Sequence, residues 1–259
     1  MPAGENLFNL QNRGFRYGDG IFETIKVCEG KILFEVYHFE RLFLGLQMLQ
    51  IKNFLQPQTL SSEILDLCKK NNCTQLARVR LAVYRNEKNT AGYAIEALAL
   101  SPENNQWNEK GLAIGVYPFA RKSADAFSNL KTANFLPYVL AGLYAKEKGW
   151  DDAIVLNAQN YICDTSKANI FLIRENEIYT PALHQGCISG VVRRFLTDEL
   201  KRTGIRVHQK EISEQDLLEA DEVFLTNSIY EMRWVASFRN KNYLSQQGFS
   251  FYQKLCEWR

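Results

Sequence analysis

The chain has no long hydrophobic run and almost no excess of one charge. No apolar stretch approaches the roughly 20 residues that a membrane helix needs, and the opening MPAGENLFNL lacks the basic and apolar regions of a signal peptide. The 31 basic and 29 acidic residues leave a net charge of +2 and are scattered rather than clustered. We therefore expect a cytoplasmic protein with neither a membrane nor a nucleic acid as partner.

Closely spaced cysteines are also lacking. Six cysteines are present, and no two of them form a C-x-x-C pair. In a reducing compartment this spacing predicts free thiols, with neither disulfides nor a zinc site. His38 and His208 have no partners at metal-ligand spacing, so we expect structural histidines and no metal. Cys163 and Cys187 are interpreted as small buried hydrophobic residues.

The composition, 46% hydrophobic and 23% charged over 259 residues, is that of an ordinary globular protein. In the first half, the turn at Glu29-Gly30 separates two β-branched runs and predicts a hairpin. Leu42, Leu46 and Leu49 have helical spacing, with Arg41 at the start of that helix, and Thr59 is a plausible N-cap of a second one. Strands are expected over about 76–84, 93–100 and 111–117.

The second half also mixes helices and strands. Helices are predicted after Lys131, from Val191 to a stop at Gly204, after a cap at Ser213, and over the aromatic tail. Buried strands are predicted at 153–156, 170–173 and 223–225. The expected organisation is α+β: a small N-terminal domain (1–117), a linker (118–129) and a larger C-terminal domain (130–259).

Six local patterns stand out, and they occur in a fixed order from about Arg13 to Val235. They are Arg16–Thr24 (RYGDGIFET), His38–Leu42 (HFERL), Leu130–Leu136 (LKTANFL), Cys163–Phe171 (CDTSKANIF), Thr180–Arg193 (TPALHQGCISGVVR) and Asp221–Ser228 (DEVFLTNS). Together they resemble the class IV aminotransferases, the fold-type IV pyridoxal phosphate enzymes, which include branched-chain and D-amino-acid aminotransferases and aminodeoxychorismate lyase.

The resemblance implies two α/β-type domains with the cofactor, pyridoxal 5'-phosphate, in the cleft between them, and a homodimer. Lys131 falls on the family's Schiff-base lysine, and Asp164 falls where the family usually has a glutamate facing the pyridine nitrogen. Arg41 matches a phosphate-binding arginine. The remaining phosphate-binding positions correspond to Val191, Val192, Asn227 and Ser228.

Physical arguments support the phosphate assignments. A helix that opens at Val191-Val192 presents unpaired backbone N–H groups and the positive end of its dipole. Arg41 supplies a planar, permanently charged guanidinium that can bind two oxygens. Arg80 is a candidate for the substrate carboxylate, with pairing to an acidic neighbour as the equal alternative.

The expected reaction moves an amino group between an amino acid and a 2-keto acid, with Lys131 as the base for the Cα proton. The lyase is the alternative: the segment Lys131-Thr132-Ala133-Asn134 favours it, whereas Ala91, where some lyases carry arginine, does not. Asp164 shortens the family's glutamate by one methylene, about 1.5 Å. A cofactor-binding protein without turnover is therefore a further alternative.

Overall fold

The structure, a computed structural model, describes residues 10–259, which divide into two compact units. Unit 1 comprises the residues up to Leu100 together with Leu130–Asn134, and unit 2 comprises Ser101–Asn129 and Phe135–Arg259. No signal peptide was expected in residues 1–10, and the first nine of these lie outside the described residues. No helix within residues 10–259 is long and apolar enough to cross a membrane.

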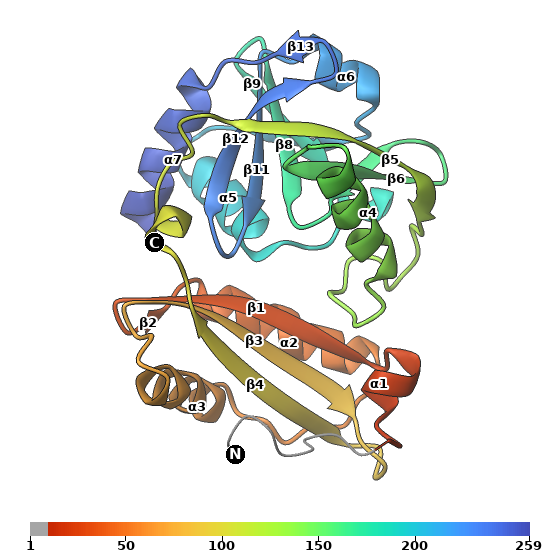
Figure 1. The fold of residues 1–259 in the computed structure, drawn as a ribbon, viewed down its shortest axis with the longest axis vertical. Coiled ribbons are helices and arrows are strands. Elements are labelled where there is room, and N and C mark those ends of the chain that lie inside the picture. Colours follow the sequence, from red (N-terminus) through yellow and green to blue (C-terminus); the bar gives the residue numbers. More distant parts are fainter. Residues whose placement is uncertain (1–9) are drawn as a thin grey trace. The chain divides into compact units, whose positions relative to one another are not determined.

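Unit 1 is an antiparallel sheet in the order β2-β1-β3-β4, with α2 and α3 packed on one face (Figure 1). Its elements are α1 (Arg13–Tyr17), β1 (Gly20–Cys28), β2 (Lys31–Ile32), α2 (Glu35–Met48), α3 (Pro57–Lys70), β3 (Leu76–Arg85) and β4 (Ala91–Ala99). Successive strand residues point to opposite faces, so Ile21 and Ile25 of β1 join Leu42 and Leu46 of α2 in the core. Phe22 therefore belongs to the other face of the sheet.

Three local predictions in unit 1 are corrected. The hairpin's second strand is only Lys31–Ile32, because α2 already begins at Glu35. Arg41 consequently lies within α2 and not at its start, so it is too far from either helix end for the helix dipole to affect it strongly. The N-cap of α3 is Gln56, since Pro57, whose ring fixes a helical φ, occupies the first turn ahead of Thr59.

The predicted domain boundaries also differ from the division into units. Leu130–Asn134 belongs to unit 1 because it runs along the edge of β1: Phe22 N donates to Lys131 O, and Ala133 N donates to Gly20 O, both at 2.9 Å. Gly18, at φ +64°, makes room for the last residue of this segment, since a Cβ there would lie 2.3 Å from Asn134 Oδ1. The first residues of the expected linker instead continue a strand to Lys122.

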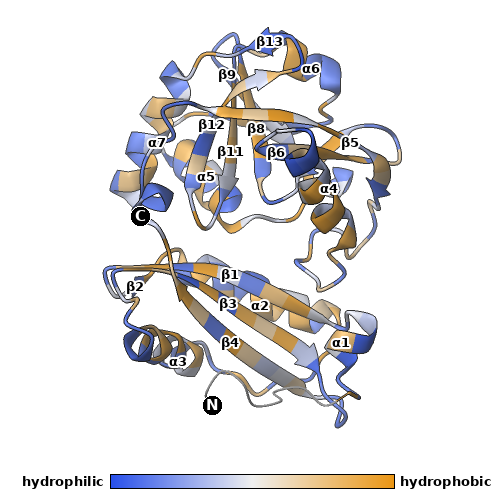
Figure 2. Ribbon diagram, in the orientation of Figure 1, coloured by the Kyte–Doolittle hydropathy of each residue, from blue (hydrophilic) through white to orange (hydrophobic). Residues whose placement is uncertain are grey.

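Unit 2 is built on a nine-stranded mixed sheet in the order β10-β9-β8-β11-β12-β5-β6-β7, with β13 paired to β12. Helices α4, α5 and α7 contact the sheet, and hydrophobic residues colour much of α4 in Figure 2. The elements are η1 (Pro102–Asn105), β5 (Leu112–Lys122), α4 (Leu136–Glu147), β6 (Asp152–Asn157), β7 (Ile162–Thr165), β8 (Asn169–Arg174), β9 (Glu177–Pro181), η2 (Leu183–Gln185), α5 (Val191–Arg202), β10 (Val207–Lys210), α6 (Glu214–Glu219), β11 (Glu222–Asn227), β12 (Glu231–Phe238), β13 (Lys241–Asn242) and α7 (Gln246–Trp258).

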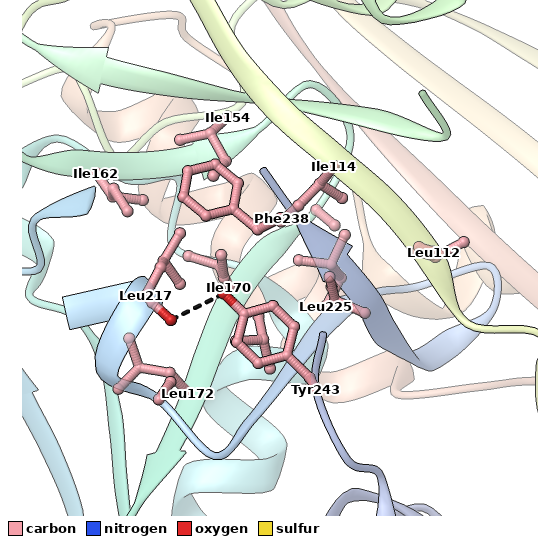
Figure 3. Close-up of a cluster of buried hydrophobic side chains, with 14 of the residues drawn as sticks. Leu112, Ile114, Ile154, Ile162, Ile170, Leu172, Leu217, Leu225, Phe238 and Tyr243 are labelled. Carbon is pink, nitrogen blue, oxygen red and sulfur yellow. Dashed lines mark hydrogen bonds between the residues drawn. The ribbon is translucent and has the colours of Figure 1, made fainter. Parts of the chain in front are cut away.

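A cluster of buried aliphatic and aromatic side chains fixes the central strands of unit 2 (Figure 3). Ile170 of β8 and Leu225 of β11 are fully buried in it and are paired across the two strands. The hydroxyl of Tyr243 donates to the Leu217 carbonyl at 2.8 Å, so this aromatic ring enters the core without an unsatisfied polar atom. This core packs against β7, β8 and β11, the strands that carry most of the candidate polar groups of this unit.

Candidate active site

Lys131 lies beside an aromatic ring and near a second cation in unit 1. Its Nζ is 4.6 Å from the centroid of the Phe22 ring, and the guanidinium carbon of Arg80 is 3.8 Å from the same centroid. Phe22 is directly opposite Lys131 on the edge of β1, whereas Arg80 reaches the ring from β3. A ring face attracts both cations through its quadrupole, so Phe22 gathers two predicted site residues.

Arg41 is fixed by a buried carboxylate. Its Nε donates to Glu23 Oε1 at 2.8 Å, its Nη2 donates to Oε2, and Nδ1 of His38 lies 2.7 Å from Oε2. His38 and Arg41 stand at i and i+3 on α2, so one helix face presents both to Glu23. Burial raises the pKa of Glu23, but Arg41 and His38 outweigh burial and lower that pKa to about 2.

His38 is a buried, neutral member of this group. Burial lowers its pKa, which Glu23 opposes and the charges of Arg41 and Lys131 reinforce. Its Nδ1 faces Glu23, while its buried Nε2 has no hydrogen-bond partner among the described residues. A structural role, as predicted for His38, accounts for the contact of Nδ1 with Glu23 but not for the unsatisfied Nε2.

Asp164 sits in unit 2 with both carboxylate oxygens in hydrogen bonds. Asn169 Nδ2 donates to Oδ1 at 2.7 Å, whereas the Tyr138 hydroxyl and the Ile188 N–H donate to Oδ2 at 2.6 and 2.9 Å. Burial, followed by the charge of Asp164, raises the pKa of Tyr138 well above its usual value, so this hydroxyl stays a neutral donor. The carboxylate is thus fixed in position by three donors from three separate segments.

Lys122 gives Asp164 a cationic neighbour. A register shift in β5 after Val116 precedes its last two residues, and the Nζ of Lys122 lies 3.5 Å from Asp164 Oδ2. The side chain is 10% exposed, and its buried Nζ has no hydrogen-bond partner in the part of the chain that the structure describes. An ammonium group carries three donors, so this one is only partly satisfied by the ion pair.

The start of α5 has the features predicted for an anion site. Its N-cap is Gly190, no side chain caps the helix, and the N–H groups of Val191 and Val192 precede the first intrahelical bond, Arg194 N to Gly190 O. A Cβ at position 190 would lie 1.7 Å from Asn169 Oδ1, so only glycine fits between this helix and the Asp164 network.

Asn227 is the last residue of β11, and Ser228 begins the turn that follows it. The Asn227 side chain is partly occupied: Oδ1 accepts from Ile229 N and Tyr230 N, and Nδ2 donates to Lys167 O. An anion contact by Asn227 would therefore use its backbone N–H or the second N–H of its side-chain amide. The neighbouring Thr226 has a buried Oγ1 with no hydrogen-bond partner among the described residues, and it is paired with Asn169 across β8 and β11.

The predicted residues therefore fall into two groups, one in each unit. Arg41, Arg80 and Lys131 belong to unit 1, whereas Asp164, Val191, Val192, Asn227 and Ser228 belong to unit 2. Glu23, His38, Asn169 and Thr226 lie within the six sequence patterns, but the patterns predict no role for them in the site. Nothing in the sequence around Tyr138 or Lys122 indicates a role, because their relevance depends on contacts made by the fold.

Other reactive side chains have structural roles. Cys163 and Cys187 are buried free thiols, and burial raises the pKa of both, to about 12 for Cys187, so neither is a nucleophile at neutral pH. His208 pairs with Glu177 at 2.6 Å. No group of three or more potential metal ligands occurs within residues 10–259.

The fold and the patterned residues define a class of protein. The chain matches the family "Amino-transferase class IV" over residues 20–238 and belongs to it. It is 29% identical over 230 residues to an aminodeoxychorismate lyase of Vibrio harveyi, covering 85% of this chain and 83% of the relative. It is 25% identical to a D-alanine aminotransferase of Listeria innocua, covering 90% and 82%.

A solved structure shares the fold. The branched-chain aminotransferase of the archaeon Thermoproteus uzoniensis, determined with norvaline, superposes with a TM-score of 0.89 at 20% identity, covering 99% of this chain and 91% of that chain. This likeness confirms the fold-type IV architecture expected from the sequence. Another branched-chain aminotransferase of the same fold was determined with pyridoxamine 5'-phosphate, at a TM-score of 0.88 and 21% identity.

Proposed function

We propose that the protein is a pyridoxal phosphate-dependent aminotransferase that moves an amino group between an amino acid and a 2-keto acid. The observation that carries this proposal is the Asp164 carboxylate, buried and fixed through both oxygens, at the position where the family places its ring-nitrogen partner. The pyridoxamine 5'-phosphate in the second branched-chain aminotransferase structure supports the choice of cofactor.

The residues present fit this cofactor. Lys122 Nζ, Thr226 Oγ1 and His38 Nε2 are buried polar atoms without hydrogen-bond partners among the described residues, and each lies beside a predicted site residue. Buried polar groups are normally satisfied, so unsatisfied ones are typical of a binding site. The uncapped start of α5, with Gly190 as its N-cap, suits a phosphate group.

The predicted site residues divide the tasks of the proposed mechanism among them. Bound pyridoxal phosphate supplies an aldehyde for amines and a ring that accepts electron density. Lys131 would be the amine that holds the cofactor through its aldehyde group, and its neutral Nζ would accept the proton from the substrate Cα. Asp164 holds a proton at the ring nitrogen. Arg41 and the first N–H groups of α5 bind the phosphate, and Arg80 binds the substrate carboxylate.

Two further points of the proposal concern the setting in which the protein works. We propose a homodimer, as the family resemblance implies, and a cytoplasmic location, since no apolar run in the sequence approaches the length of a membrane helix. Size-exclusion chromatography with light scattering measures the first, and microscopy of a fluorescent fusion measures the second.

Aminodeoxychorismate lyase is the second candidate, and the identity to the Vibrio harveyi enzyme supports it. Pyruvate release from aminodeoxychorismate without any keto acid would establish the lyase. Amino-group transfer from amino acids to a panel of 2-keto acids would establish the aminotransferase. The Lys131→Ala variant should lose either activity. Cofactor binding without either activity would instead indicate a protein that has lost turnover.

A further inference from the structure

The Asp164 carboxylate already has its charge balanced by the protein. It accepts three neutral hydrogen bonds, from Asn169, Tyr138 and Ile188, and lies 3.5 Å from the ammonium group of Lys122. One cationic ring nitrogen is enough to balance the single charge of a carboxylate, so a second cation is not needed for that role. The presence of Lys122 therefore changes what this carboxylate can do.

We propose that Lys122 is a positioning residue that competes with the cofactor's ring nitrogen for the charge of Asp164 and so weakens protonation of that nitrogen. The inference rests on the proposed function, in which Asp164 faces the ring nitrogen. The bound ring should then accept electron density less readily than it would beside Asp164 without Lys122.

The geometry argues against a purely structural role for Lys122. Its Nζ is buried, makes no hydrogen bond within residues 10–259 and lies 5.1 Å from the centroid of the Tyr138 ring. Burying an ammonium group is costly unless its donors are satisfied, so an apolar side chain of similar length would stabilise the fold at least as well. What the lysine contributes is a positive charge beside Asp164 and Tyr138.

Electrostatics gives the direction of the effect. A cation within about 4–6 Å of an ionisable group typically changes its proton affinity by about 1–3 powers of ten. With Lys122 charged, a protonated ring nitrogen would be a second cation on one carboxylate. Without that charge, Asp164 would favour the protonated ring nitrogen. The protein's preference for a ligand with a ring nitrogen over one without it would then increase.

The test compares two ligands that differ at one ring atom. Apoenzyme is titrated with pyridoxamine 5'-phosphate and with its 1-deaza analogue, in which C–H replaces the ring nitrogen, and the ratio of the two Kd values is measured. The variants are Lys122→Met, Lys122→Gln and Asp164→Asn. The control is Lys148→Met, which removes an exposed lysine of the same unit that pairs with Glu147.

We expect both neutral replacements of Lys122 to increase the preference for the nitrogen-containing ligand by about tenfold or more. Asp164→Asn should reduce that preference below the wild-type value, and Lys148→Met should leave it unchanged. A ratio that stays constant in the Lys122 variants while both Kd values change together would show a structural role and overturn the inference.

Failure of the proposed function has a different signature. Pyridoxamine 5'-phosphate carries an amine and forms no bond with Lys131, so these titrations do not depend on the lysine's chemistry. Wild-type protein that binds neither ligand would contradict the proposed function itself. Wild-type protein that binds both, with a Lys122-independent ratio, would contradict only the inference about Lys122.

Discussion

Lys131 and Phe22 are joined twice, once through the backbone and once through their side chains. The Lys131 carbonyl accepts from the Phe22 N–H at 2.9 Å, and the lysine Nζ lies 4.6 Å from the ring centroid. The lysine proposed to bond the cofactor is therefore placed by strand β1, far away in the sequence. Arg80 shares the same ring from β3.

Arg80→Met tests the proposed substrate contact. No salt bridge links Arg80 to an acidic side chain within residues 10–259, although the charge of its cross-strand neighbour Glu96 acts on the guanidinium, so Arg80 is still able to bind a substrate carboxylate. We expect KM for the amino acid to rise about 10- to 100-fold, because a charged hydrogen bond contributes about 1.5–3 kcal/mol. An unchanged KM in steady-state kinetics would remove Arg80 from the site.

Glu23→Gln tests the carboxylate that fixes Arg41. The folded pKa of Glu23, about 2, lies below its ordinary value of 4.5, so its ionisation stabilises the fold above pH 4.5. That contribution is about 3 kcal/mol and is lost as the pH falls from 4.5 towards 2. Urea unfolding should show a stability deficit in the variant at pH 7 that shrinks in acid. The exposed Glu96→Gln is the control, and a deficit independent of pH would contradict the account.

Asp164→Glu restores the residue usual in the family, yet we expect it to weaken cofactor binding. The donors from Tyr138, Asn169 and Ile188 are placed for the shorter side chain, and an added methylene in a packed site costs about 1–3 kcal/mol. The Kd for pyridoxamine 5'-phosphate should rise about tenfold, and Tyr138→Phe in the same chain should recover part of it. Tighter binding by Asp164→Glu alone would show that the network is not adapted to aspartate.

Thr226→Val separates a ligand contact from a structural one. Its Oγ1 is buried without a partner in the described part of the chain, so valine should leave the free energy of unfolding unchanged or raise it by about 1 kcal/mol. The same change at Thr180, whose hydroxyl donates to Ile170 O at 2.8 Å, should lower it by about 1 kcal/mol. The Kd for pyridoxamine 5'-phosphate should increase several-fold only in Thr226→Val. Equal losses of stability in both variants would show that the Thr226 hydroxyl has a structural partner.

Features governed by local chemistry were predictable from the sequence. The capping box at Ser213 and Asp216 is present, and α5 ends at Arg202, two residues before Gly204. The strand expected over about 76–84 is Leu76–Arg85. These features depend on neighbours in the chain, which is why residue patterns indicate them.

Features that depend on distant contacts were not predictable. Nothing in the residues around Lys131 indicates that they complete the edge of β1, and nothing around Lys122 indicates a neighbour in Asp164. Likewise, the spacing within HFERL shows that His38 and Arg41 share a helix face, but Glu23 becomes their partner only when β1 packs on α2. The residues of the site could be proposed from motifs, whereas their supporting contacts required the fold.

Covalent labelling tests directly whether Lys131 is the amine that bonds the cofactor. Holoenzyme is reduced with borohydride, digested, and mapped by mass spectrometry, with Lys131→Arg and the exposed Lys148→Met treated in parallel. We expect a phosphopyridoxyl group on Lys131 in the wild type and in Lys148→Met, and none in Lys131→Arg. A reduced adduct on another lysine, or an unmodified Lys131 in the wild type, would contradict this expectation.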